Sequence, residues 1–292
     1  MQVYRGLDIG TAKASQTMRE RVAHHLLDLV EPEQDYSVAE FQGEGRAVLD
    51  ALVRRDTAAV ICGGSGLHFR SIVDPLEFPP HDESLRTELE SLEVAAARHR
   101  LLKADPNAAA HVDMDNPRRV VRALEIAAIT GLTPSERSQT PNATAVRNYE
   151  PVVDFVAIGV DPADDMAVRV EQRFDRMLSE GLMEEVRGLQ GRLGRLAGQA
   201  VGYKEMAPVF SGEQTLAEGR AAAIRATMAL AKRQRTFFRR DPRIHWITWD
   251  PDPDARLRSA LDRLDRILPV SYTHLTLPTT LCMCRSRWSP CH

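Results

Sequence analysis

The chain has 292 residues, of which 43% are hydrophobic and 27% are charged. This composition is typical of a folded globular protein with one large domain or two smaller ones, and it excludes collagen-like, disulfide-scaffold and wholly disordered chains. The net charge of −3 gives the molecule no general attraction for polyanions, so a nucleic acid would have to be held by local basic clusters. No window resembles a membrane-spanning helix or a secretory signal, and we expect no membrane partner.

The end of the chain differs in composition from the rest. Residues 270–292 are rich in Thr, Pro and Cys, and Cys282, Cys284 and Cys291 lie there at spacings that fit no common zinc pattern. We expect this stretch to be a non-native, disordered tail, with a native disordered tail as the alternative. The remaining cysteine, Cys62, lies in an apolar run. So few cysteines favour the reducing cytoplasm as the location.

Strand and helix patterns alternate along the chain, which predicts an α/β fold. Three short apolar runs are typical of buried strands: 58–62, 152–160 and 245–249. Capping patterns predict helices that follow Ser37, Asn116 and Asp161. Residues 81–150 are charged, Ala-rich or polar, which predicts a helical insertion there and leaves 1–80 and 151–269 as the α/β core.

A glycine-rich turn from Gly63 to Gly66 directly follows the first predicted strand. At the carboxyl end of a parallel strand, such a turn lets backbone N–H groups approach a ligand. Ser65 adds a hydroxyl that could reach a phosphate or a base. A turn that needs glycine only for backbone freedom is the alternative, and the motif alone does not decide between them.

The predicted helix after Asn116 carries arginines in its first turn. Arg118 and Arg119 lie where the helix dipole is already positive, and Arg122 follows one turn later on the same face. Helix N-termini with added arginines are natural phosphate sites. Pairing of these arginines with the acidic residues just upstream is the alternative of equal weight.

A long helix predicted over 216–240 carries the strongest signal for a polyanion. Its basic residues are Arg225, Lys232, Arg233, Arg235, Arg239 and Arg240. Three of them recur every seven residues, so they form one stripe along the helix. The opposite side has a narrow apolar seam of Ile224, Met228 and Ala231. In a protein of net negative charge, a stripe this dense indicates contact with a phosphate backbone.

The opening segment offers a further candidate site. Asp8, Thr11 and Lys13 together supply a carboxylate, a hydroxyl and an ammonium, which are the groups that commonly hold a magnesium diphosphate. These residue types are common elsewhere, so the segment does not establish a site by itself.

Six segments, in this order, resemble the successive motifs of the bacterial tRNA dimethylallyltransferase family: MQVYRGLDIGTAK, HHLLDLVEPEQDYSVAEF, GGSGLHFRSI, DNPRRVVRALEI, QAVGYKEM and LAKRQRTFFRR. The resemblance runs from Met1 to about Leu268. It implies a P-loop NTPase-like parallel sheet flanked by helices, with a helical insertion that contacts the anticodon arm. It also implies Mg²⁺-assisted transfer of a dimethylallyl group from dimethylallyl diphosphate to the N6 amine of the adenosine 3′ of the anticodon, in tRNAs that read codons beginning with U. We expect a cytoplasmic monomer.

The resemblance also assigns residues to roles. The tRNA-binding residues would be Met1, Gln2, Ser65, Arg86, Arg118, Arg119, Val120, Val121, Arg122, Gln199, Ala200, Val201, Gly202, Tyr203, Lys204, Lys232, Arg233, Gln234, Arg235 and Arg239. Thr11 and Lys13 would line the diphosphate. Ser65 stands where the family usually has threonine, and Arg118 where it usually has glutamine. The metal ligands are not identified.

The start of the chain departs from the family pattern. Family members have a GxxxxGK[ST] phosphate loop and then Asp-Ser, whose aspartate is the proposed general base, directly before the segment that begins here at Met1. No GxxxxGK[ST] occurs in the 292 residues. We therefore expect an N-terminally truncated, inactive fragment without a catalytic residue of its own. The alternatives are a non-catalytic tRNA-binding remnant and a prenyltransferase that acts on free adenine nucleotides.

Overall fold

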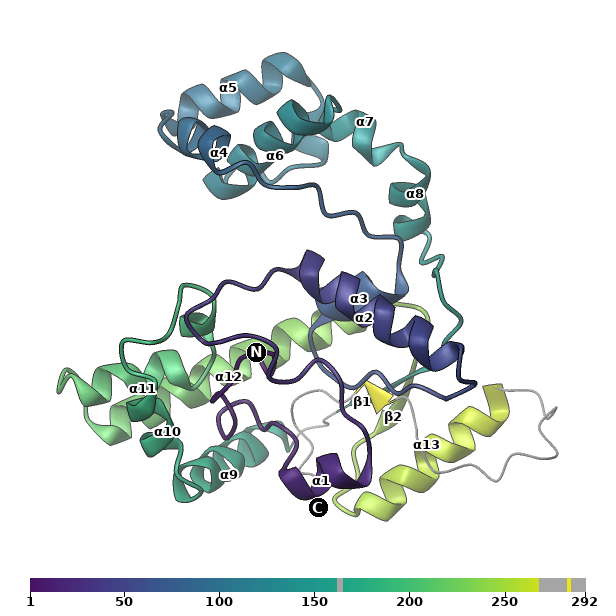
Figure 1. Ribbon diagram of the computed structural model, residues 1–292, viewed down its shortest axis with the longest axis vertical. Helices are drawn as coiled ribbons and strands as arrows, with labels where there is room; N and C mark the ends of the chain where they lie inside the picture. The colour runs from purple at the N-terminus through teal and green to yellow at the C-terminus, as the bar shows by residue number, and fades with distance from the viewer. Residues whose placement is uncertain (162–164, 268–282, 285–292) are drawn as a thin grey trace. The chain divides into compact units, whose positions relative to one another are not determined.

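A computed structural model describes residues 1–161, 165–267 and 283–284 of the chain. The chain forms two compact units. Unit 1 comprises residues 1–72 together with residues from 155 onward, and unit 2 comprises residues 73–154. Both units are built mainly of helices, as Figure 1 shows. The helical insertion that the sequence predicts at 81–150 falls inside unit 2.

Unit 1 contains a small parallel sheet in the order β2–β1–β3. The strand β1 (Ala157–Asp161) pairs with β2 (Ile244–Thr248) on one side and with β3 (Met283–Cys284) on the other. The first four residues of β1 are buried, as expected of a parallel strand covered on both faces. The strands predicted at 152–160 and 245–249 are therefore confirmed, with shifted starts. Apart from β3, the predicted tail at 270–292 lies outside the described residues.

The strand predicted at 58–62 is wrong. These residues enter no ladder among the described residues, and Ala58, Ala59 and Cys62 are exposed. An apolar run becomes a strand only where a neighbouring strand takes up its backbone hydrogen bonds, and the apolar pattern does not contain that information. The glycine-rich turn still follows, and it leads into the helix α3 (Gly66–Val73).

The helices of unit 1 are α1 (Gln16–Arg21), α2 (Val38–Val53), α3, α9 (Met166–Ser179), α10 (Leu182–Gly188), α11 (Tyr203–Phe210), α12 (Leu216–Phe238) and α13 (Pro253–Ile267), with a 3-10 turn η2 (Ala197–Gln199). The capping box predicted at Ser37 is confirmed, because Ser37 and Glu40 each accept the other's backbone N–H. Part of the cap predicted after Asp161 falls at 162–164, outside the described residues.

The helices α9 to α12 pack around the main core of unit 1. α12 contacts α9 and α11, and α10 contacts the same two helices. Leu182, Tyr203 and Met206 are fully buried there, and each buried side chain of this size stabilises the fold by about 1.5–3 kcal/mol. The predicted apolar seam of α12 is confirmed, because Ala231 is buried against Val170 and the other seam residues pack beside them. This packing directs the basic face of α12 away from the core.

Unit 2 consists of α4 (Glu83–Glu90), α5 (Val94–Ala104), the 3-10 turn η1 (Ala108–Ala110), α6 (Pro117–Thr130), α7 (Pro134–Ser138) and α8 (Pro141–Arg147). α6 packs on α4 and α5 over a small core that includes Leu89, Leu101 and Leu124. The predicted limits of α6 are confirmed. The helix begins at Pro117 and ends at Gly131, whose φ of +71° is the left-handed conformation that favours glycine.

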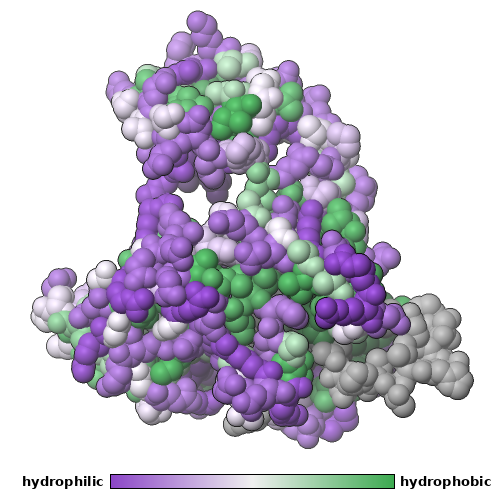
Figure 2. Space-filling view, viewed as in Figure 1, coloured by the Kyte–Doolittle hydropathy of each residue, from purple (hydrophilic) through white to green (hydrophobic). Residues whose placement is uncertain are grey.

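The surface of unit 1 is not uniformly polar. On the face drawn in Figure 2, hydrophobic residues gather where Figure 1 places α3 and α12, and hydrophilic residues surround them. Leu67 on α3 and Phe237 on α12 are among the exposed large hydrophobic residues. Within the described residues, no helix has the length and apolar character needed to cross a membrane.

Candidate functional site

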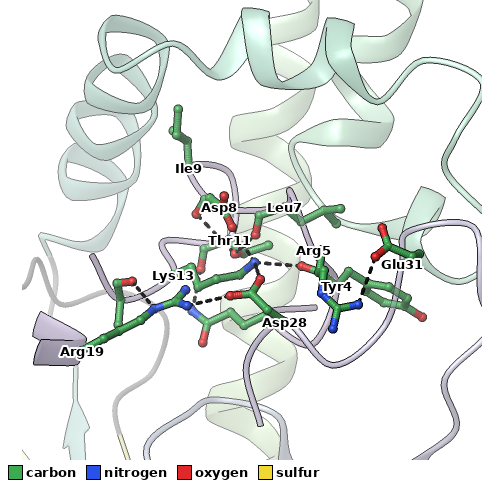
Figure 3. A network of polar contacts seen from close by, with 12 residues as sticks. Tyr4, Arg5, Leu7, Asp8, Ile9, Thr11, Lys13, Arg19, Asp28 and Glu31 are labelled. Carbon is green, nitrogen blue, oxygen red and sulfur yellow. Dashed lines mark hydrogen bonds and ion pairs between the residues drawn. The ribbon is translucent and has the colours of Figure 1, made fainter. Parts of the chain in front are cut away.

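The opening segment folds into a closed polar network (Figure 3). Lys13 Nζ donates to the Tyr4 carbonyl at 2.8 Å, to Asp8 Oδ1 at 2.5 Å and to Asp28 Oδ1 at 2.6 Å, and the Lys13 side chain is 1% exposed. Arg19 binds the other oxygen of Asp28 at 2.7 Å. Burial alone would raise the pKa of Asp28, but the hydrogen bonds from Lys13 and Arg19 bring that pKa below its ordinary value. Lys13 therefore ties the segment together with all three of its N–H donors.

Thr11 and Gln2 complete this network. The buried Thr11 hydroxyl donates to the Leu7 carbonyl at 2.5 Å, and the Gln2 amide donates to the carbonyls of Thr11 and Ala12 at 3.0 Å each. The assignment of Thr11 and Lys13 to the diphosphate stays a prediction, and in this structure the polar groups of both side chains are engaged within the chain. Met1 and Gln2 are half-buried.

Glu185 is a central residue that sequence reasoning missed. Its carboxylate accepts the backbone N–H groups of Asp8, Ile9 and Gly10 at 3.1, 2.8 and 3.1 Å, and it also accepts the hydroxyl of Tyr203. Successive backbone N–H groups of this kind form an anion-binding nest, which Glu185 fills. Burial and the contact with Glu185 raise the pKa of Tyr203. No local sequence pattern could reveal a contact between such distant segments.

The stretch QAVGYK, predicted to contact RNA, contains both exposed and buried residues. Gln199 and Lys204 are exposed, and Lys204 Nζ donates to Gln199 Oε1 at 3.0 Å. Val201 is half-buried. Ala200, Gly202 and Tyr203 are buried, and Ala200 and Tyr203 belong to the main core of unit 1. The assignment of these three residues to tRNA contact stays a prediction, and in this structure little of their surface is exposed.

A cavity of about 320 Å³ lies beside this stretch. Its wall is largely apolar, with Val186, Leu189 and Ala207 among the lining residues. Tyr203 and Lys204 also line it. The cavity thus adjoins the exposed part of the predicted RNA-contact stretch.

The glycine-rich turn meets the end of α12. Ser65 is exposed, and its Oγ lies 2.7 Å from His68 Nδ1, whose ring packs edge-on against Phe41 at 4.7 Å. A Cβ added at Gly66 would lie 2.1 Å from the ring of Phe237, so only glycine permits this close approach. Two predicted RNA-contact segments, far apart in the sequence, are therefore adjacent in space.

The basic stripe at the end of α12 is largely accessible. Lys232, Arg233 and Arg239 are exposed and Arg235 is half-buried. Arg239 binds Asp161 Oδ2 at 2.6 Å, and Arg235 lies 3.3 Å from both oxygens of the same carboxylate. Gln234 is buried on the inward face of the helix, and its predicted RNA contact stays a prediction.

In unit 2, the first turn of α6 has both exposed and buried residues. Arg118 and Arg119 are exposed, and Arg119 lies 3.4 Å from Asp113, a pairing that the sequence left open. Val120 and Val121 are buried in the core of unit 2, and their assignment to RNA contact stays a prediction. Arg118 and Arg119 remain the accessible cations of this turn.

Arg122 faces inward, onto the segment that leads into α4. It donates to the carbonyls of Pro79 and Pro80 at 2.7 and 3.1 Å and to Glu125 at 2.8 Å. Glu125 is fully buried and also accepts the Asp82 N–H at 3.1 Å. Burial would raise the pKa of Glu125, but these hydrogen bonds hold that pKa below its ordinary value. Arg122 thus has a structural role, which the sequence did not indicate.

Arg86, the other predicted tRNA contact of unit 2, lies on α4. It pairs with Glu90 one turn later, at 2.9 Å. This hydrogen bond raises the pKa of Arg86. The guanidinium stays half-exposed, so the pair leaves part of it accessible.

Comparison with known proteins places the chain in a family. Residues 2–241 match the family model described as IPP transferase. The chain belongs to the IPP transferase family. A tRNA dimethylallyltransferase of Streptomyces coelicolor is 44% identical over 256 residues, which are 85% of this chain and 80% of that protein. The family predicted from the six segments is therefore confirmed.

Solved structures agree with the fold of this IPP transferase. The full-length tRNA isopentenylpyrophosphate transferase of Bacillus halodurans has a TM-score of 0.63 at 34% identity, covering 90% of this chain and 84% of that one. A eukaryotic dimethylallyltransferase described as acting on tRNA has a TM-score of 0.76 and covers 93% of this chain and 72% of that one. At 22% identity, the second likeness shows the fold alone. The predicted P-loop-like α/β class with a helical insertion is confirmed.

Proposed function

We propose that this IPP transferase is a tRNA dimethylallyltransferase. It transfers a dimethylallyl group from dimethylallyl diphosphate to the N6 amine of the adenosine 3′ of the anticodon, in tRNAs that read codons beginning with U. The observation that carries the proposal is the junction of α12 with the glycine-rich turn. There, exposed cations adjoin an exposed aromatic ring, Phe237, and an exposed hydroxyl, Ser65.

This junction has the chemistry that RNA recognition needs. Cations such as Lys232 and Arg233 neutralise phosphates without reading sequence, and aromatic rings stack on unpaired bases. Phe237 lies directly on Gly66, so a base stacked on this ring would lie near the Ser65 hydroxyl. Arg118 and Arg119 give unit 2 a second accessible group of cations, suited to the anticodon arm.

The reaction makes two demands on the protein. The target base must leave the anticodon stack to be reached, and a flipped base needs a pocket edge with hydrogen-bonding groups. Ser65 Oγ supplies such a group beside His68. The diphosphate that departs carries negative charge, which nearby guanidiniums stabilise. We assign this second task to the arginines at the end of α12.

We also propose that Mg²⁺ binds together with the diphosphate. Magnesium keeps several waters and takes substrate phosphate oxygens as ligands, so it needs few carboxylates from the protein. The described residues contain no group of three or more His, Cys, Asp or Glu side chains placed to hold a metal ion. We also propose that the enzyme is a monomer and lies in the cytoplasm.

Two other functions make different predictions. A prenyltransferase of free adenine nucleotides would not need a long cationic helix, because a mononucleotide covers only a small part of it. A tRNA-binding remnant would hold the anticodon arm without transferring anything. The extent of the exposed stripe on α12 favours tRNA over a free nucleotide.

RNA binding by the chain tests the proposal. Fluorescence anisotropy measures the affinity for a labelled anticodon-arm RNA at several salt concentrations, with AMP as competitor. We expect AMP to compete weakly. Lys232→Gln should lower the affinity and reduce the salt slope by about 1, as expected for the loss of one phosphate contact. Arg220→Gln is the matched control, because Arg220 lies on the same helix but pairs with Asp175. Equal competition by AMP, or equal effects of the two substitutions, would overturn the proposal.

A further inference from the structure

Asp161 occupies an unusual position for an acidic residue in a candidate RNA-binding surface. It is the last residue of β1, at the carboxyl end of a parallel strand, where open α/β sheets bind ligands. Its backbone carbonyl accepts the Trp249 N–H at 2.9 Å, which fixes its place at the sheet edge. Its carboxylate takes both Arg235 and Arg239 from the basic stripe.

The two guanidiniums are not fully satisfied by this one carboxylate. Among the contacts that the described residues show, two guanidiniums share this one carboxylate, so these three groups carry an excess of +1. Arg235 Nε is buried and has no hydrogen-bond partner within the described part of the chain. A buried donor left without an acceptor is unfavourable, and a phosphate offers more acceptor oxygens than a carboxylate does. The cluster therefore has the charge to hold one more anion, and an anion that displaces this guanidinium could give its Nε an acceptor.

The contact between Asp161 and the arginines is also easily exchanged. The side chains of Arg235 and Arg239 are 38% and 52% exposed, and that of Asp161 is 22% exposed. Ion pairs this open to solvent are weak and are screened by salt. A phosphate group that arrives from solvent can displace the carboxylate, because arginine binds phosphate in a two-pronged geometry.

We propose that Asp161 is an internal competitor for phosphate: it holds Arg235 and Arg239 in place while the surface is empty and yields them to a phosphate group of the substrate. This inference rests on the proposed function and adds to it a residue that limits affinity. Asp161 is a positioning residue, since it acts through the two arginines. The phosphate can come from the RNA backbone or from the diphosphate, which share the same chemistry.

The test compares Asp161→Asn with Asp175→Asn in the full chain. Both substitutions remove the negative charge of an aspartate that pairs with arginines of α12. Asp175, on α9, pairs with Arg220 at 2.7 and 2.9 Å. Arg220 precedes Arg235 by 15 residues, or about 22 Å along the helix, which exceeds the screening length of about 8–10 Å. Affinities for an anticodon-arm RNA and for inorganic pyrophosphate are measured by anisotropy and by calorimetry.

We expect Asp161→Asn to tighten RNA binding by about two- to fivefold at low salt, in line with the release of an exposed ion pair, and to steepen the salt dependence. Asp175→Asn should change neither the RNA affinity nor its salt dependence. Arg239→Gln should then weaken binding more in the Asp161→Asn background than in the parent. Weaker RNA binding by Asp161→Asn, or the same effect from both aspartate variants, overturns the proposal.

A comparison of Arg239→Gln with Lys232→Gln does not need the Asp161→Asn variant. If Asp161→Asn does not fold, Arg239→Gln should lose less affinity than Lys232→Gln, because Asp161 already offsets part of what Arg239 contributes; an equal or larger loss contradicts the proposal. Tighter binding of RNA alone assigns the phosphate to RNA, and tighter binding of pyrophosphate alone assigns it to the diphosphate. If the parent chain binds no RNA but Asp161→Asn binds pyrophosphate more tightly, the proposed function fails while this inference stands.

Discussion

Replacement of Lys13 by methionine separates the structural role of this residue from its predicted role at the diphosphate. Methionine keeps the apolar stem but removes the ammonium, and with it the hydrogen bonds to Tyr4, Asp8 and Asp28. If Lys13 mainly holds the opening segment together, the variant loses stability. If it mainly binds diphosphate, the fold is little affected and pyrophosphate affinity falls.

The structure sets the size of the expected loss. Removing one partner of a buried ion pair costs about 3–5 kcal/mol. Here the loss is smaller, because Asp28 keeps Arg19 at 2.7 Å and the side chain of Asp8 is 56% exposed. We expect Lys13→Met to lower the free energy of unfolding by about 2–3 kcal/mol, since the Tyr4 carbonyl also loses its donor. For a unit of this size, the melting temperature should fall by about 4–12 °C.

Thermal unfolding followed by tryptophan fluorescence measures this change. Trp246 and Trp249 lie in unit 1, and residues 73–154 of unit 2 contain no tryptophan, so the signal does not come from unit 2. Arg5→Gln is the matched control in the same network, because the Arg5–Glu31 pair is half-exposed and should shift the melting temperature by less than about 2 °C. A Lys13→Met variant that melts like Arg5→Gln while losing pyrophosphate affinity would refute the structural role.

Three further substitutions test other contacts. Glu125→Gln should destabilise unit 2 by about 2–3 kcal/mol, seen as faster amide exchange in α6, because Arg122 loses its charged partner. The pKa of Glu125 is lowered in the folded state, so the ionised carboxylate stabilises unit 2 fully above about pH 4.3. This stabilisation should be lost as the pH falls through the folded pKa. Unchanged amide exchange in α6 contradicts this expectation. Gly66→Ala should cost about 1–3 kcal/mol in unfolding experiments, since the new methyl group meets Phe237, and a neutral effect contradicts the close approach. Ser65→Ala should weaken binding of an anticodon arm that contains the target adenosine more than binding of one that lacks it, and equal losses speak against a base contact.

Local sequence signals predicted the helices well. The capping box at Ser37, the helix start at Asn116–Pro117 and the helix end at Gly131 are confirmed, because each depends on hydrogen bonds or backbone conformation within a few residues. The apolar seam of α12 is confirmed for a related reason: helical periodicity alone decides which side chains share a face.

The sequence patterns did not predict contacts between distant parts of the chain. The predicted strand at 58–62 failed because strand formation depends on a neighbour elsewhere in the chain. Glu185 reaches Asp8 across 177 positions, and no spacing rule connects them. The inward orientation of Arg122 was missed because a basic residue in an arginine-rich turn looks accessible until its buried partner is known.

Transfer of the dimethylallyl group is the decisive measurement. The protein is expressed and incubated with unmodified tRNA, dimethylallyl diphosphate and Mg²⁺. The tRNA is then digested and its nucleosides are identified by mass spectrometry. Our proposal predicts a dimethylallyl group on N6 of the adenosine 3′ of the anticodon, only in tRNAs that read codons beginning with U, and no product with AMP. Unmodified tRNA under saturating substrates, or a product with AMP alone, would contradict it.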